Sequence, residues 1–440
     1  MSGSPETSPS AAGLASRQAA VGILSQVLRR KRPLDQAAAE ILAASSLAPR
    51  DGAFARAIAA ASLRRFGQLE ALIRAFVPKT PPPHKAGPTL EILIAGAAEL
   101  LFLNVPAHAA VDAANKLAQS DLKAVHFKAL INAVLRRVSI EGPSLLAQQD
   151  AAALNVPDWL FERWIANYGE ARARLIADAH LPIPPLDLTL KASDDPYTDF
   201  SGAAHQAPGR VRLKDAGKIE NLPGFQEGRW WVQDFAASLP ATLLGDVAGR
   251  TIIDLCAAPG GKTLQLASAG ARVISVDAVP ERLALIRDNL ARTKLSAELI
   301  AADARDWRPE APSPFVLLDA PCTATGTIRR HPDLPWLKSA ADLVNAESLQ
   351  SELLDAAGAM TAAGGTLVYA VCSLEPEEGI EQIESFLRRR TDFVRSELGP
   401  DAAVDSTFIT PKGDLTTLPF YWADKGGMDG FYAARLKRLL

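Results

Sequence analysis

Residues 251–263 read TIIDLCAAPGGKT: a short apolar run, a glycine-containing turn and then the start of a helix-like segment. Further apolar runs follow at 273–276, 298–301, 315–318 and 366–371, and helix-like segments separate them. This alternation is the signature of a parallel sheet flanked by helices. Ligands of such sheets lie at the carboxyl ends of the strands, so we expect the informative residues directly after each run.

The loop after the first run is suited to binding a ligand. Gly260 and Gly261 allow close approach of the backbone, and the start of the next helix supplies unpaired N–H groups. A phosphate-binding G-x-x-x-x-G-K-[ST] loop is the nearest alternative, which Gly261-Lys262-Thr263 would complete if residue 256 were glycine. That residue is Cys256, which disfavours a P-loop ATPase.

Two carboxylates follow the next two apolar runs. Asp277 ends the second run and Asp303 comes just after the third. The first suits a ribose diol, as in dinucleotide-binding folds, and the second suits the exocyclic amine of adenine. A single Asp in such a place is more often only a helix cap. Here the glycine-containing loop, Asp277 and Asp303 follow three successive runs, and this arrangement favours a nucleoside site instead.

Two of the three cysteines also follow apolar runs. Cys322 lies in LLDAPCT, residues 317–323, and Cys372 lies in AVCSLEPEE, residues 370–378. A lone buried cysteine is usually a small inert hydrophobe. Two thiols at one sheet edge beside a nucleoside site favour a chemical role. Metal binding is disfavoured, because no histidine is placed to complete a four-ligand set.

The α/β region follows a helical front. Apolar residues recur at helical spacing from residue 16 onward, with no strand pattern among them. We therefore expect a disordered end at 1–15, a helical domain at 16–142, a connecting subdomain with short strands at 143–229 and an α/β domain at 230–440.

Charge divides unevenly along the chain. Residues 1–150 hold 17 Lys and Arg against 11 Asp and Glu, a net charge of +6, and the remainder carries −9. A basic front is compatible with nucleic acid binding and equally with ordinary solvated helix faces.

Membrane insertion and secretion are not indicated. The most apolar stretch, 90–103, carries Glu91 and Glu99 and is shorter than the roughly 20 apolar residues of a spanning helix, so we expect a buried helix. We find no secretory signal, and an odd cysteine count favours a reducing compartment. We expect a cytoplasmic monomer.

The region from 230 to the C-terminus resembles the Nop/Sun family of RNA cytosine-5 methyltransferases. The matching segments are Val232-Gln233-Asp234 with Ser238, 254–263, Asp277, Asp303, Asp319-Ala320-Pro321-Cys322, GTIRRHPD at 326–333, Cys372-Ser373, Glu377-Glu378 and Asp429-Gly430-Phe431-Tyr432. The front resembles a NusB-like RNA-binding domain, a fusion typical of bacterial 16S rRNA members. The resemblance implies a Rossmann-like class I methyltransferase domain with a mostly parallel seven-stranded sheet, after an all-α NusB-like domain and a small α+β connecting subdomain.

The resemblance also implies the cofactor, S-adenosylmethionine, which leaves as S-adenosylhomocysteine after methylating C5 of a specific cytosine in 16S rRNA. The residues that it implies for cofactor binding are Cys256, Ala257, Ala258, Pro259, Gly260, Gly261, Lys262, Asp277, Arg282, Asp303 and Asp319.

Four residues receive catalytic roles from the same resemblance. Cys372 is the implied nucleophile: its thiolate adds to C6, C5 then attacks the sulfonium methyl, and loss of the C5 proton expels the thiol. Cys322 assists release of the product. Asp319 binds the N3/N4 edge of cytosine and rejects uracil, and Lys262 positions the base. The target base must be unstacked to reach such a site.

Some features depart from the family or stay open. The run Arg329-Arg330-His331 provides candidate phosphate contacts or ordinary solvated charges. The family usually has Thr where this chain has Val371, and Ser-Gly where it has Thr323-Ala324. Neither change removes a reacting atom. The competing hypothesis is a non-catalytic RNA-binding adaptor that retains the fold, which the intact cysteines, aspartates and glycine loop disfavour.

Overall fold

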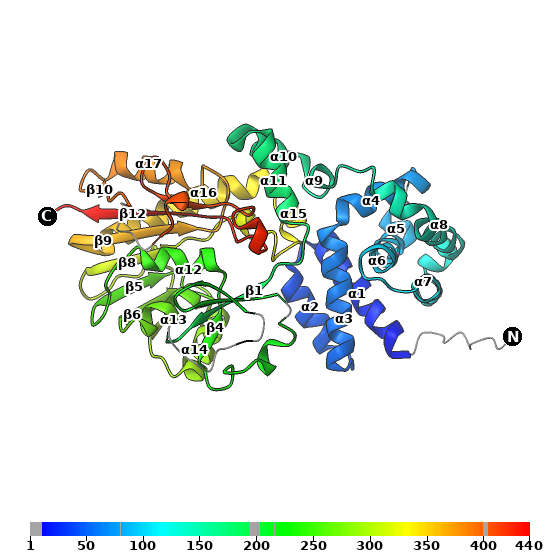
Figure 1. Cartoon of the computed structure of the whole chain (residues 1–440), viewed down its shortest axis with the longest axis horizontal. Coiled ribbons are helices and arrows are strands. Elements are labelled where there is room, and N and C mark those ends of the chain that lie inside the picture. The colour runs from blue at the N-terminus through cyan, green and yellow to red at the C-terminus, as the bar shows by residue number, and fades with distance from the viewer. Residues whose placement is uncertain (1–10, 80, 193–199, 201–202, 215, 399–403) are drawn as a thin grey trace. The chain divides into compact units, whose positions relative to one another are not determined.

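The computed structural model describes residues 11–79, 81–192, 200, 203–214, 216–398 and 404–440 (Figure 1). The chain divides into two compact units. One unit contains the chain up to Leu181 together with 331–338, and the other contains 182–330 and 339–440. The short stretch 331–338 therefore groups with the helical front, although its neighbours in sequence belong to the α/β unit.

The described residues of the first unit are helical, as the sequence predicts for 16–142, and the helices continue to Ala179, into the stretch 143–229 that was assigned to a connecting subdomain with short strands. Its helices are α1 (Ala11–Arg30), α2 (Leu34–Ala43), α3 (Pro49–Arg64), α4 (Phe66–Phe76), α5 (Pro83–Ala86), α6 (Thr89–Phe102), α7 (Ala107–Ser120), η1 (Ala124–Phe127), α8 (Lys128–Leu146), α9 (Ala151–Leu154), α10 (Asp158–Tyr168), α11 (Glu170–Ala179) and α15 (Leu334–Leu337). Because α1 begins at Ala11, it extends into the stretch that was expected to be disordered, of which residues 1–10 lie outside the described residues.

The apolar stretch at 90–103 forms the buried helix α6. Glu99 is buried on it, and its carboxylate accepts a hydrogen bond from the Arg17 guanidinium at 2.8 Å, while Glu91 pairs with Arg29. A buried carboxylate needs such a partner to offset its lost hydration. Within the described residues, every helix is too short or too polar to span a bilayer.

The 331–338 segment is packed into this helical unit by two side chains. The Asp333 carboxylate accepts a hydrogen bond from the Leu34 N–H at 2.8 Å. The Trp336 indole donates to the Leu63 carbonyl at 2.9 Å and meets the Phe66 ring edge-on at 4.9 Å. The indole therefore buries apolar area and satisfies its one donor at the same time.

The second unit is built on a large sheet (Figure 1). Its strands are β5 (Thr251–Leu255), β6 (Arg272–Asp277), β7 (Glu298–Ala301), β8 (Ser313–Asp319), β9 (Thr361–Val371), β10 (Phe393–Arg395), β11 (Leu415–Thr417) and β12 (Phe431–Arg438). The order is β10-β12-β9-β8-β5-β6-β7, with β11 paired to β12 as an eighth strand. Strands β5 to β9 pair in parallel and β12 runs antiparallel to β9. The mostly parallel sheet and its five predicted strands are confirmed, and the sheet has eight strands rather than the seven that the resemblance implies, because β11 pairs with β12.

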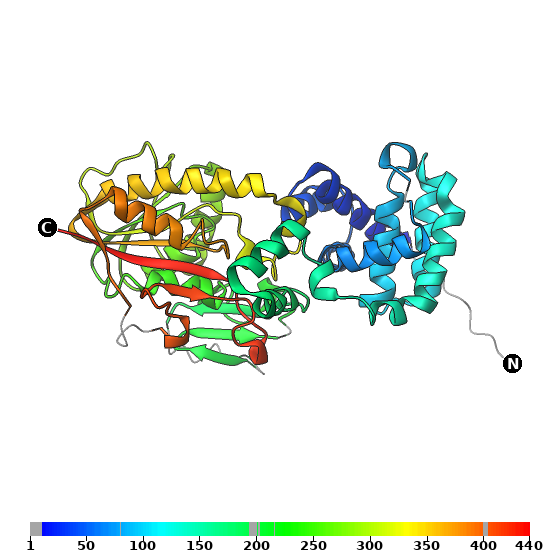
Figure 2. The same ribbon diagram turned by 90° about the horizontal axis from the view of Figure 1, so that it is seen from above.

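Helices cover both faces of this sheet. The faces alternate along each strand: Ile253 and Leu318 pack with α16 (Ala340–Met360) and α17 (Ile380–Arg389), while Ile252 and Leu317 pack with α12 (Phe235–Thr242). Figure 2 shows α16 and α17 lying along one face. Helices α13 (Gly261–Ser268) and α14 (Pro280–Thr293) contact strand β6. Burial on both faces explains why these strands are continuous apolar runs rather than alternating ones.

A small antiparallel sheet precedes the large one. Its order is β2-β3-β1-β4, and its strands are β1 (Leu186–Leu190), β2 (Ala204–Ala207), β3 (Arg210–Leu213) and β4 (Trp230–Val232). The buried Arg212 of β3 forms a bidentate pair with Asp187 of β1, both bonds being 2.6 Å. Because β4 leads directly into α12, this sheet is held against the large-sheet loops and forms one wall of the site below.

Candidate active site

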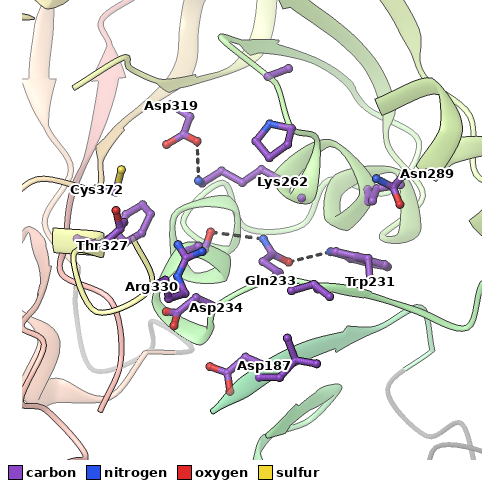
Figure 3. A pocket seen from close by; sticks show the side chains of 18 of the residues that line it. Asp187, Trp231, Gln233, Asp234, Lys262, Asn289, Asp319, Thr327, Arg330 and Cys372 are labelled. Atoms are coloured by element: carbon purple, nitrogen blue, oxygen red, sulfur yellow. Dashed lines mark hydrogen bonds and ion pairs between the residues drawn. The ribbon is translucent and has the colours of Figure 1, made fainter. Parts of the chain in front are cut away.

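Two cavities lie at the carboxyl ends of the parallel strands, within the α/β unit. The larger cavity, about 430 Å³, is lined by the loop after β5, the ends of β8 and β9, strand β4 and the start of β12 (Figure 3). The smaller cavity, about 130 Å³, is lined by the ends of β6 and β7 and by α16. The strand tips chosen from the sequence therefore surround two neighbouring cavities.

The loop after β5 separates the two cavities. Gly260 adopts a left-handed backbone (φ 103°), and a Cβ added there would lie 3.0 Å from Ile286. Both features favour glycine. Asp254 at the tip of β5 accepts a hydrogen bond from Thr263 at 2.6 Å, and burial raises the pKa of Asp254 to about 7. The Asp254–Thr263 bond therefore ties the strand to the start of α13.

The cofactor residues expected from the sequence divide between the two cavities. Those that line the larger cavity are Ala257, Pro259, Gly261, Lys262 and Asp319, and those that line the smaller are Cys256, Asp277 and Asp303. The other three hold the loop in shape: Ala258 donates its N–H to Asp277 at 3.1 Å, Arg282 donates to the Ala258 carbonyl at 2.5 Å, and Gly260 precedes α13.

The carboxylates of the smaller cavity are held by their neighbours. Asp277 also accepts from the Val279 N–H at 3.0 Å, and Arg282 lies 3.6 Å from it. Asp303 pairs with Arg305 at 2.7 Å, and the hydrogen bonds from Arg305 lower the pKa of Asp303. Both carboxylates are thus fixed acceptors at consecutive strand tips. Among the described residues, no group of three or more His, Cys, Asp or Glu is arranged to bind a metal ion.

A buried ion pair lies in the larger cavity. The Lys262 ammonium donates to the Asp319 carboxylate at 2.7 Å, and the two are drawn facing each other in Figure 3. Lys262 also lies over the Phe431 ring, 5.0 Å from its centroid. Its side chain is only 8% exposed, so the carboxylate and the ring together compensate the lost hydration of the ammonium.

The structure brings two of the three cysteines together. The Cys322 and Cys372 sulfurs lie 3.4 Å apart, and Cys372 lines the larger cavity. The hydrogen bond with Cys372 and burial raise the pKa of the Cys322 thiol well above its usual value. Burial and the neighbouring Asp277 raise the pKa of Cys256 as well. Cys322 therefore keeps its proton and can donate it in a hydrogen bond to the Cys372 sulfur.

A close backbone approach supports the end of β9. The Gly326 N–H donates to the Cys372 carbonyl at 3.0 Å, and the Gly430 N–H donates to the Gly326 carbonyl at 2.8 Å. A Cβ on Gly326 would lie 2.1 Å from the Gly430 carbonyl oxygen. Glycine is therefore required at 326, which accounts physically for part of the GTIRRHPD motif.

The departures from the family pattern have local explanations. Thr323 retains the hydroxyl that Ser would supply, and this hydroxyl donates to Glu378. Ala324, where the family has Gly, adopts a left-handed backbone with φ 60°. This conformation costs on the order of 1 kcal/mol for a residue with a Cβ. Val371 is fully buried at the end of β9, where an apolar side chain packs without an unsatisfied hydroxyl.

One prediction about phosphate contacts is wrong. Arg329 is 1% exposed and its guanidinium pairs with Asp234 at 2.9 Å, so it supports the fold. Arg330 lines the larger cavity and pairs with Asp429 at 2.7 Å. Burial opposes the charged form of Arg330, but Asp429 and nearby groups outweigh it and raise its pKa. His331 belongs to the helical unit, near Asp35, and its role as a phosphate contact stays a prediction.

Sequence reasoning assigned no role to two other residues of the larger cavity. Gln233 accepts from the Trp231 indole at 3.0 Å and from the Thr189 hydroxyl at 2.9 Å, and its amide donates to Gln265 at 3.1 Å (Figure 3). Phe431 covers Lys262. Both residues lie in segments that carried the family resemblance, but nothing in their local spacing indicated a wall of this cavity.

Comparisons with known proteins agree with this architecture. The family model described as 16S rRNA methyltransferase RsmB/F matches residues 241–437, and the NusB family model matches 14–139. Ribosomal RNA small subunit methyltransferase B of Sodalis glossinidius is 40% identical over 81% of this chain and 86% of its own length. The protein of the same name from Vibrio cholerae is 35% identical over 96% and 97%.

A solved structure shows the same fold along the whole chain. The crystal structure of PH0851 superposes with a TM-score of 0.75 at 21% identity, covering 99% of this chain and all of that one. Identity and coverage with the curated relatives are high enough to assign a family. The chain therefore belongs to the RsmB/F family of 16S rRNA methyltransferases, with a NusB-family domain at its front.

Proposed function

We propose that this protein transfers a methyl group from S-adenosylmethionine to C5 of one cytosine in 16S rRNA, through a transient bond between Cys372 and C6. The observation that carries the proposal is the 3.4 Å separation of the Cys322 and Cys372 sulfurs beside the Lys262–Asp319 pair. The names of the curated relatives support ribosomal RNA of the small subunit as the substrate class.

The larger cavity suits the target base. At about 430 Å³ it falls within the size range of small-ligand sites, and its walls combine apolar side chains with charged ones, among them Lys262, Asp319 and Arg330. The Asp319 carboxylate accepts from the amino group of cytosine, which uracil lacks. Lys262 keeps Asp319 in place and offers its remaining N–H bonds to the base. A base in this cavity has to be unstacked from its RNA, as for other enzymes that act on a base edge.

The two sulfurs suit different tasks. Cys372 faces the cavity that would hold the base, and the guanidinium of Arg330 lines the same cavity. Cys322 retains its proton because its pKa is raised. We assign Cys372 as the nucleophile that adds to C6 and Cys322 as the group that assists release of the product.

The smaller cavity suits the adenosine part of the methyl donor. Asp277 would accept from the ribose hydroxyls and Asp303 from the adenine amine, while the 256–262 loop would hold the remainder through its backbone. Both carboxylates are already oriented by backbone N–H groups or by Arg305. When bound, S-adenosylmethionine supplies an electrophilic methyl group. We further propose that the helical unit binds RNA and that the protein acts as a cytoplasmic monomer.

The test is methylation of deproteinised 16S rRNA by purified protein with tritiated S-adenosylmethionine, followed by nucleoside analysis and site mapping. We expect label in 5-methylcytidine at one position, and none with Cys372→Ser. Label in another nucleoside would contradict the assigned chemistry. RNA binding without any label would favour the alternative, a non-catalytic RNA-binding adaptor.

A further inference from the structure

Glu378 is a fully buried acid that the proposed chemistry does not use. Its carboxylate accepts four hydrogen bonds: from the Thr323 N–H at 2.8 Å, from the Thr323 hydroxyl, from the Ser373 hydroxyl and from the Gln350 amide at 3.0 Å. Four donors match the acceptor capacity of an ionised carboxylate. The group is therefore satisfied by neutral donors from three separate segments.

Two of these donor residues directly follow the reactive cysteines. Thr323 comes after Cys322, and Ser373 comes after Cys372. Cys322 in the loop after β8 and Cys372 in the loop after β9 are 50 positions apart in sequence. The Glu378 carboxylate connects the two loops by binding the residue next to each cysteine. A displacement of this carboxylate would therefore displace Thr323 and Ser373, and with them both sulfurs.

The surrounding contacts fix Glu378 itself. Its carbonyl accepts from the Tyr369 hydroxyl at 2.6 Å, and Tyr369 is fully buried in β9. Gln350 of α16 donates to the Pro321 carbonyl at 2.9 Å as well as to Glu378. The residues on both sides of Cys322 are therefore held in place: Gln350 binds the Pro321 carbonyl, and Glu378 binds Thr323.

The charge of Glu378 adds a second effect. In the described part of the chain, no Lys or Arg nitrogen lies within ion-pair distance of this carboxylate. An uncompensated charge in a buried site acts strongly on its neighbours. It contributes, after the hydrogen bond with Cys372 and burial, to raising the pKa of Cys322. Glu378 therefore favours the proton on the same cysteine that its hydrogen bonds hold in place.

We propose that Glu378 is a positioning residue, which sets the separation of the Cys322 and Cys372 sulfurs by anchoring Thr323 and Ser373. The proposal rests on the proposed function for its catalytic consequence, since only a reaction that uses both sulfurs is sensitive to their separation. The separation itself can be measured without that reaction.

The first arm of the test is steady-state kinetics of Glu378→Gln with 16S rRNA. The glutamine has the same size but replaces one acceptor oxygen by a donor, so it cannot satisfy all the hydroxyls. A displacement of about 1 Å costs on the order of 10²-fold in rate. We expect kcat to fall by about this factor, with KM for RNA and Kd for S-adenosylmethionine within about twofold of wild type. Glu381→Gln, an exposed site on α17, is the matched control.

The second arm uses neither RNA nor cofactor. Diamide takes two electrons and two protons from the two thiols, which forms a disulfide and the reduced hydrazine, and peptide mass mapping distinguishes Cys322–Cys372 from any product of Cys256. The 3.4 Å separation favours this disulfide in the wild type. We expect its formation to slow by about tenfold in Ser373→Ala, which cuts one anchor and keeps the charge of Glu378, and not in Glu381→Gln.

The outcomes separate this proposal from the proposed function. Wild-type disulfide rates in folded Ser373→Ala and Thr323→Val proteins, which cut single anchors and keep the acid, overturn the positioning role, whatever the kcat of Glu378→Gln. Slowed disulfide formation supports it even if Cys372→Ser were to retain methylation, a result that would refute only the proposed function.

Discussion

The two cavities at the strand tips share one loop but differ in their charged groups. The larger holds a cysteine sulfur together with Lys262 and Arg330, each of which is paired with a carboxylate, whereas in the smaller cavity Asp277 and Asp303 lie with Arg305 and a protonated Cys256. Cations near a thiol favour its anionic form and attract RNA, whereas carboxylates suit hydroxyls, amines and a positively charged sulfonium. The comparison teaches that one sheet edge can carry two neighbouring cavities with different charged groups, with Asp319 and Cys372 lining the larger one.

The largest expected effect comes from the larger cavity. Cys372→Ser replaces the proposed nucleophile with a hydroxyl that stays neutral, and we expect methyl transfer to fall by at least about 10³-fold. The smaller cavity should be unaffected, so calorimetry should give the wild-type Kd for S-adenosylmethionine. Residual turnover within tenfold of wild type would remove Cys372 from its role.

Asp319→Asn changes the carboxylate that we propose recognises the base in the larger cavity. The change leaves the buried Lys262 without its carboxylate and turns part of the acceptor into a donor. We expect kcat/KM to fall by about 10²-fold and discrimination against uracil to weaken. Rates on matched RNAs carrying cytosine or uracil at the target measure both. An undiminished preference for cytosine would contradict recognition by Asp319.

Asp277→Asn should affect the smaller cavity alone. Loss of a charged acceptor to the ribose is expected to cost about 1.4 kcal/mol, which is a tenfold increase in the Kd for S-adenosylmethionine. RNA affinity should not change. The matched control is Asp288→Asn, an exposed site on α14. Equal loss of RNA and cofactor affinity would show that the cavities are not independent.

Asp254→Asn should have the smallest effect on turnover and a clear effect on stability. Burial raises the pKa of Asp254 from its usual 3.8 to about 7 in the folded protein. Below about pH 4 the carboxyl of Asp254 is protonated in both the folded and the unfolded protein, and its contribution to stability is fully present. This contribution is lost as pH rises through 7, which lowers the free energy of unfolding by about 4 kcal/mol in total. We expect the wild-type Tm to fall by several degrees more than that of the variant between pH 5 and 8. Parallel Tm profiles would contradict a raised pKa.

The sequence predicts the sheet well because its signals are local. Each strand is a short apolar run, and Asp277 and Cys372 directly follow their runs, while Cys322 comes four positions after its run. The site could be placed at one sheet edge for the same reason, since parallel strands end together.

Other features depend on contacts that no local pattern records. Arg329 looked like a phosphate contact because its buried partner, Asp234, lies 95 positions away. The four donors of Glu378 lie at 323, 350 and 373, and only the fold brings them together. The stretch 331–338 groups with the helical unit because Trp336 packs against distant helices, whereas its neighbours in sequence carry the α/β pattern.

The central claim is that Cys372 bonds to the target base while Cys322 assists its release. Mass spectrometry of Cys322→Ala, incubated with 16S rRNA and S-adenosylmethionine, denatured and digested, tests it most directly. We expect a nucleotide linked to the peptide that contains Cys372, in an adduct that survives denaturant. Absence of any adduct during turnover, or linkage through Cys256, would contradict the claim.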